Sequence, residues 1–311
     1  MRGRLPALVS LLAVCGVLAA LPFVLSDYNE LLAAQVGIYF IAVLGLNILT
    51  GYTGQISIGH GAFMAVGGYT TAVMSRDHHT SLILTMLLAF AICFVLGLLV
   101  GLPALRLSGV YLALATFALA VSVPQLPLKW SKFLGGRDGV QTARTVSHSW
   151  LYGAAWTASA ILFVLAWFIL RGRVGRAFRA VRDSEIAAVA SGIELPVYKT
   201  LAFGISAAYA GVAGSLFVLA TNGFAAPDEF GVVLSLQLLV GAAVAGLGSL
   251  WGVLAGAVFV GLLPTVSSSV PVIGSNHGRD VVFGAAVVLV MLLLPGGFAG
   301  LLARLRRFAG A

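Results

Sequence analysis

Charge is the scarcest feature of this 311-residue sequence. Only 9% of its residues are Asp, Glu, Lys or Arg, whereas 60% are hydrophobic. A soluble domain carries charge on roughly a quarter of its residues, because charges cover the water-facing surface. The composition therefore excludes a soluble enzyme, a disordered chain and a secreted disulfide scaffold. It indicates an all-α, polytopic membrane helical bundle.

Several motifs of catalytic chemistry are also missing. Both cysteines, Cys15 and Cys93, lie inside apolar runs, so neither a structural disulfide nor a metal site is expected. None of the three lysines, Lys129, Lys132 and Lys199, follows a glycine, so the chain has no Walker A phosphate-binding loop. The five histidines form no HExxH motif and no Cys/His array. We therefore expect no catalytic residues, no metal and no bound cofactor, and the chain is not expected to be an enzyme.

Acidic residues are absent from the middle of every long apolar stretch. All ten lie in loops or near the expected helix ends. Proton-driven carriers commonly relay protons through buried Asp, Glu or His, so this class is disfavoured, while a sodium-coupled carrier stays open. The net charge of +8 is concentrated in short loops and at the termini. Such charges set membrane topology, so we expect contact with membrane lipid and no nucleic acid.

The charge-free stretches predict about ten transmembrane helices, since roughly 20 apolar residues cross a bilayer. The expected spans are 5–25, 31–49, 57–75, 82–103, 107–127, 150–170, 200–221, 230–247, 251–268 and 280–302. They form a single transmembrane domain over 1–311. An even count, with arginines near both ends, places both termini in the cytoplasm. The first span is interpreted as an uncleaved helix rather than a signal peptide.

One basic loop disagrees with this topology. The 128–149 loop carries Lys129, Lys132, Arg137 and Arg144, yet the count places it outside. The positive-inside tendency would place such a loop in the cytoplasm. Two explanations stay open: a folded external segment, or a miscount of one span before it.

The long 171–199 loop combines apolar periodicity with both signs of charge. Its apolar residues at helical spacing are Val174, Phe178 and Val181, with Ile186, Ala187 and Ala190 expected to continue the same face. Gly192 is expected to end one helix and Pro196 to begin the next. The loop therefore contains one or two short amphipathic helices. A helix on anionic lipid is one interpretation, but Asp183, Glu185 and Glu194 favour docking to a cytoplasmic protein.

Several segments of the chain resemble known permeases. The run from Glu185 to Gly192, followed by Leu195-Pro196, resembles the EAA-type loop of ABC importer permeases, although Ile186 separates the glutamate from the alanine pair. Further segments resemble the LivM type of branched-chain amino acid permease: 51–69, 175–183, 198–203, 210–214 and 246–252. The resemblance covers about residues 31–300.

The resemblance implies a multi-pass permease subunit of an ATP-driven importer in a bacterial plasma (inner) membrane. The implied partners are a LivH-like second permease subunit, two cytoplasmic ATP-binding subunits that use the ATP, and an extracytoplasmic substrate-binding protein. The implied ATPase-coupling residues are Gly175, Arg176, Arg179, Glu185, Ala187, Ala188 and Gly192. The expected substrates are branched-chain or related hydrophobic amino acids. Urea or short amides on the same scaffold are the alternative, and a self-sufficient carrier ranks third.

The glycine-rich segment 51–68 is expected to interrupt the helices beside it. Each glycine costs a helix about 1 kcal/mol relative to alanine. Broken backbone is tolerated in a membrane only where it faces protein or water. We therefore name Gln55, Ser57 and His60 as candidate translocation-path residues, against the alternative of a tight turn between packed helices. Because the charges are peripheral, we expect this chain to bind substrate no tighter than about 1 mM, or roughly 4 kcal/mol.

Overall fold

The structure is a computed structural model that describes residues 26–78, 80–107, 109–143, 145–268, 284–285, 288–289, 292 and 296–300. The expected span 5–25 and most of 280–302 lie outside these residues. The helices are α2 (Asp27–Leu46), η2 (Asn47–Tyr52), α3 (His60–His78), α4 (Leu82–Ala104), α5 (Val110–Ser122), η3 (Val123–Gln125), α6 (Leu126–Lys129), α7 (Ser131–Leu134), η4 (Gly136–Asp138), α8 (His148–Arg171), α9 (Arg173–Asp183), α10 (Glu185–Ala190), α11 (Leu195–Ala220), η5 (Pro227–Phe230), α12 (Val232–Ala245) and α13 (Val253–Ser268). Two short strands, β1 (Val140–Gln141) and β2 (Phe224–Ala225), pair in antiparallel fashion.

The described residues form an almost entirely helical bundle, as the composition predicted. Six of its helical segments are long and apolar enough to cross a membrane: Asp27–Tyr52, Leu82–Ala104, Val110–Lys129, His148–Arg171, Leu195–Ala220 and Pro227–Ala245. A shorter apolar helix covers Val253–Thr265. The helix from His60 to His78 also matches an expected span, and its 19 residues are long enough to cross a membrane but are not apolar enough to count among the six.

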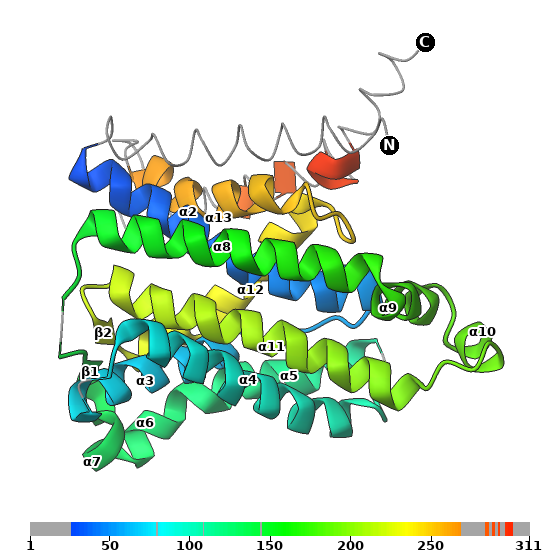
Figure 1. Cartoon of the computed structure of the whole chain (residues 1–311), viewed down its shortest axis with the longest axis horizontal. Helices are drawn as coiled ribbons and strands as arrows, with labels where there is room; N and C mark the ends of the chain where they lie inside the picture. The colour runs from blue at the N-terminus through cyan, green and yellow to red at the C-terminus, as the bar shows by residue number, and fades with distance from the viewer. Residues whose placement is uncertain are drawn as a thin grey trace, which may run out of the picture.

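Helix α11 lies at the centre of the bundle, between α8 on one side and α3 and α4 on the other (Figure 1). It packs against α4, α3 and α2, and nearly all of its length is buried. Small residues allow this close packing, as expected for helices in lipid. A Cβ atom at Gly97 of α4 would lie 2.6 Å from the Ala207 Cβ, and one at Gly101 would lie 2.9 Å from the Thr200 Cα.

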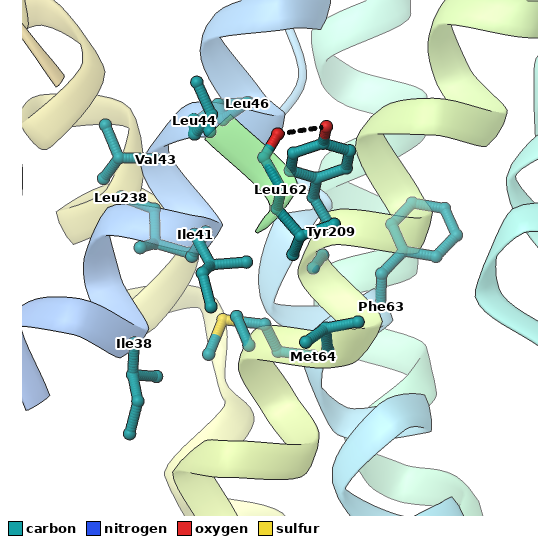
Figure 2. Packing of buried hydrophobic residues seen from close by; sticks show 14 of the residues in the cluster. Ile38, Ile41, Val43, Leu44, Leu46, Phe63, Met64, Leu162, Tyr209 and Leu238 are labelled. Atoms are coloured by element: carbon teal, nitrogen blue, oxygen red, sulfur yellow. Dashed lines mark hydrogen bonds between the residues drawn. The ribbon is translucent and has the colours of Figure 1, made fainter. Parts of the chain in front are cut away.

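The core contains buried polar groups that bond across helices. Figure 2 shows Tyr209 among Leu, Ile and Met side chains, with its hydroxyl donating to the Leu162 carbonyl at 2.8 Å. Thr71 and Ser215 pair through their hydroxyls at 2.6 Å. A buried polar group is costly unless it has a partner, so these bonds fix the relative positions of α11, α8 and α3.

The connecting segments gather at two opposite ends of the bundle. At one end, β1 pairs with β2, and Ser149 at the start of α8 donates to the Glu30 carboxylate at 2.7 Å. Helices α6 and α7 lie at this end, whereas α9 and α10 project from the other (Figure 1). The basic 128–149 segment is therefore a small folded unit that shares its end with the acidic loops. The segment is folded, as the first explanation expects, and its side of the membrane stays a prediction.

Candidate functional site

The 171–199 loop forms two short helices that turn their apolar residues in opposite directions. In α9, Ala177, Phe178 and Val181 are buried against the bundle, with Phe178 0% exposed. Phe178 packs edge-on against Tyr198 of α11, with ring centroids 6.4 Å apart. A short helix with few internal contacts gains most of its stability from such tertiary burial. Helix α9 is therefore held firmly on the bundle.

Gly175 permits the close approach of α9 to the end of α8. A Cβ atom at this position would overlap the Leu170 carbonyl. Arg179 reaches the same carbonyl, with its Nη1 donating at 3.1 Å. Arg176 and Arg179 are both exposed residues. Of these three candidate coupling residues, Gly175 and Arg179 contact the end of α8.

Helix α10 is capped at both ends. Ser184 is the N-cap and its hydroxyl accepts a bond from the Ala187 N–H at 3.3 Å. At the other end, Ile193 N–H bonds to the Ala188 carbonyl and Gly192 N–H bonds to the Val189 carbonyl, at 3.0 and 2.9 Å. This is a Schellman motif, which needs a left-handed residue, and Gly192 has φ +80°. The expectation that Gly192 ends a helix is confirmed, and it does so by adopting the left-handed backbone conformation that the motif requires.

The expectation of one continuous apolar face over α9 and α10 is wrong. Ile186 is 85% exposed and Val189 is 55% exposed, whereas Ala188 is buried. The extended backbone of Ser184, between the two helices, redirects the chain. Val189, together with the stretch 192–196, lines a shallow groove beside the start of α11. The exposed part of α10 is thus apolar at its centre.

Glu185 has a partner within the chain. Its carboxylate lies 2.7 Å from the Lys199 amine, and the Lys199 side chain is only 7% exposed while that of Glu185 is 48% exposed. A buried amine needs an opposite charge, so this pair fastens α10 to α11. Ala187 is exposed and Ala188 is buried, so the two alanines of the predicted coupling motif have different surroundings.

The glycine-rich segment interrupts the helices, as the sequence predicted. The last turn of the α2 helix is the π-helical η2, and residues 54–59 are not helical before α3 begins at His60. Side chains from other helices satisfy the broken backbone. Ile58 N–H donates to Thr116 Oγ1 of α5 at 3.0 Å, and Gly61 N–H donates to Ser235 Oγ of α12 at 2.9 Å. Part of the break is therefore packed against protein, while Gly54 and Ile56 are exposed.

All three candidate path residues are buried in the packed break. Gln55 donates from Nε2 to Thr53 Oγ1 at 3.0 Å, and Ser57 Oγ accepts from the Gly59 N–H at 3.3 Å. His60 is 1% exposed, and its Nε2 atom has no hydrogen-bond partner among the described residues. These contacts place the residues together at the break, and their role in a path stays a prediction.

Two residues that bond at the break were not identified from the sequence. Arg182 donates from Nη1 to the Gly51 carbonyl at 2.5 Å, and Asn47 bonds to the backbone of residues 248 and 249. Asn47 is the one amide in the apolar stretch 36–49, and that isolation is a signal that sequence reasoning passed over. Gly248 and Gly252 lie before α13, in the non-helical segment 246–252.

Among the described residues, no three His, Cys, Asp or Glu side chains gather as metal ligands. The arrangement offers close packing, backbone pairing and a short helix with exposed apolar side chains.

The comparison with protein families gives one match. Residues 29–293 match the family described as "Branched-chain amino acid transport system / permease component". This chain belongs to that family. The match spans α9, α10, the break after η2 and the loop before α13, so the candidate site lies inside the family's shared region.

Similar proteins with curated names support this membership. The permease protein LivM of Salmonella typhimurium is 31% identical over 318 residues, covering 92% of this chain and 73% of LivM. LivH of the same organism is 24% identical over 286 residues, covering 84% of this chain and 91% of LivH. The autoinducer 2 import system permease protein LsrC of Enterobacter sp. (strain 638) is 28% identical over 279 residues, covering 85% of this chain and 78% of LsrC. No solved structure matches the chain.

Proposed function

We propose that this chain is the membrane permease subunit of an ATP-driven importer for branched-chain or related hydrophobic amino acids. Family membership and the name of LivM support the substrate class. The similarity to both LivM and LivH supports a second, related permease subunit as its partner. Two separate ATP-binding subunits supply energy, and an extracytoplasmic binding protein delivers the substrate.

The observation that carries the energy coupling is the exposed face of α10. A large apolar side chain such as Ile186, held outward on a helix with two caps, has no stabilising role in the isolated chain. Exposed apolar groups ringed by charge mark sites of protein association. Glu185, Glu194 and Asp183 are exposed and lie near Ile186 in the sequence, which favours a protein partner over anionic lipid. The proposed occupant is an ATP-binding subunit on the cytoplasmic side.

This assignment sets the topology. With α9 and α10 in the cytoplasm, the acidic loops and the β1–β2 unit face the outside. In this proposal the full chain has ten spans with both termini in the cytoplasm. Eight of them correspond to α2, α3, α4, α5, α8, α11, α12 and α13, of which α3 and α13 are not among the six candidate spans. Substrate selection rests with the binding protein, and the permease provides a weak, apolar route that opens alternately to each side.

The test is reconstitution of this chain with its second permease, the ATP-binding subunits and the binding protein in sealed vesicles. We expect ATP-dependent uptake of leucine that urea and acetamide do not inhibit. Inhibition by the amides, without leucine uptake, would assign the alternative substrate class. Paired changes Ile186→Asp and Val189→Asp should release the ATP-binding subunits while the permease pair stays in the membrane. Full uptake in that variant would exclude α10 as the docking site.

A further inference from the structure

Arg182 connects the last turn of α9 to the break after η2. Its Nη1 donates to the Gly51 carbonyl at 2.5 Å, across 131 residues of sequence. The last carbonyls of a helix have no partner within the helix. Thr53 Oγ1 and the Gln55 N–H both donate to the Leu49 carbonyl nearby, at 2.5 and 3.3 Å. The Gly51 carbonyl instead accepts its bond from Arg182 of α9, which together with α10 is called the α9–α10 unit (residues 173–190).

The same turn of η2 is clamped to the loop before α13. Asn47 is 0% exposed, and its Nδ2 donates to the Ser249 carbonyl while its Oδ1 accepts from the Gly248 N–H, both at 2.9 Å. An amide that pairs with both a donor and an acceptor of one backbone segment holds that segment in register. Asn47 therefore joins the non-helical segment 246–252 to η2, the helix that leads into the break at 54–59.

Arg182 also contacts this loop directly. A Cβ atom at Gly248 would lie 2.6 Å from Arg182 Nη1, and Gly248 has φ +82°. A Cβ atom at Gly51 would overlap Asn47 Oδ1 and the Gly248 nitrogen. The guanidinium thus lies where α9, η2 and the 246–252 loop meet, with no side chain of Gly51 or Gly248 as a spacer. Arg182 is an exposed residue, so this junction lies at the surface of the bundle, and the guanidinium is joined to it by its bond to the Gly51 carbonyl.

We propose that Arg182 is the positioning residue that passes movement of the α9–α10 unit to both helix breaks. A shift of α9 moves the Arg182 guanidinium, and its hydrogen bond displaces the Gly51 carbonyl in the same direction. The two hydrogen bonds of Asn47 then displace the 246–252 loop together with η2. This inference rests on the proposed function, because it needs an ATP-binding subunit to move α10. It assigns the transmission to one bond between segments that are distant in sequence.

The test compares Arg182→Gln, Arg182→Lys and the control Arg173→Gln in the fully reconstituted importer. Arg173 is an exposed arginine on the same helix, so its removal changes the charge of α9 equally. We expect Arg182→Gln to lower leucine taken up per ATP hydrolysed by roughly tenfold, the scale of coupling between sites. Arg182→Lys keeps a charged donor but lacks the planar guanidinium, so its uptake per ATP hydrolysed should fall by about threefold. Arg173→Gln should match wild type.

Two further readouts separate transmission from a merely structural role. The ATP-binding subunits should bind Arg182→Gln and hydrolyse ATP as they do with wild type. The double variant Asn47→Ala, Arg182→Gln should lose no more coupling than the worse single variant, because both residues act on one connection. A wild-type ratio of uptake to hydrolysis in Arg182→Gln would overturn the proposal. Loss of subunit binding in Arg182→Gln would also overturn it, since Arg182 would then be a docking residue.

Failure of the proposed function gives a different result. In that case wild type itself shows no ATP-dependent uptake. If wild type transports leucine and only the Arg182 variants behave unexpectedly, the error lies in this inference alone.

Discussion

Helices α9 and α10 follow one another in sequence, but they use apolar side chains in opposite ways. Helix α9 buries Phe178 and Val181 against its own bundle, while α10 presents Ile186 and Val189 outward. Both helices are too short to be stable alone. Helix α9 is stabilised by packing, and α10 by its caps and the Glu185–Lys199 pair. The difference shows that α9 is part of the packed bundle, whereas α10 leaves apolar side chains exposed, as the proposed docking role requires.

The largest expected effect comes from removing the α9 anchor. Phe178→Ala should lower the free energy of unfolding by about 3–5 kcal/mol, because it empties a fully buried aromatic site. The matched control is Phe168→Ala on α8, where the side chain is 70% exposed. Thermal unfolding of the purified permease pair in detergent measures both. Equal, small shifts for the two variants would mean that α9 is not anchored by packing.

A smaller effect, on binding rather than stability, is expected on α10. Ile186→Ala should weaken association with the ATP-binding subunits by about tenfold, or about 1.4 kcal/mol, since it removes apolar area from the interface. The melting temperature should not change, because Ile186 is 85% exposed. Ile161→Ala on α8 is the matched control, with an isoleucine that is 63% exposed away from the site. Titration of the ATP-binding subunits against vesicle-bound permease measures the affinity. Equal affinity of both variants would remove Ile186 from the interface.

The smallest effect is expected at the pair that fastens α10 to α11. Glu185→Gln should lower the free energy of unfolding by about 0.5–1 kcal/mol, because half of the glutamate side chain faces water, where ion pairs are weak. A double-mutant cycle of Glu185→Gln with Lys199→Met measures the coupling by thermal unfolding. Glu194→Gln is the control, since Glu194 is an exposed acid on the same loop. Additive effects in the cycle would show that the pair contributes nothing, and Glu185 would then be free to bind a partner.

The candidate site was predictable where its signals are local. Gly192 ends α10, the 51–68 segment breaks the helices, and the 171–199 loop forms short helices, because capping and glycine cost act within a few residues. The direction of α10 was not predictable from the helical period. Ser184 interrupts that period, so the spacing of Ile186 from Phe178 no longer reports a shared face.

By itself, the sequence determined the membrane class, the positions of most helices and the likeness to permeases. These features depend on composition and on patterns within a few neighbouring residues, which do not require the tertiary structure. Only the tertiary structure decided that Glu185 pairs with Lys199, that Ile186 faces outward and that Arg182 meets Gly51. The physical reason is that a residue 131 positions away becomes a neighbour only when the whole bundle has packed. Arg182 is one of several arginines on a basic helix, and its place beside a broken helix end sets it apart from them.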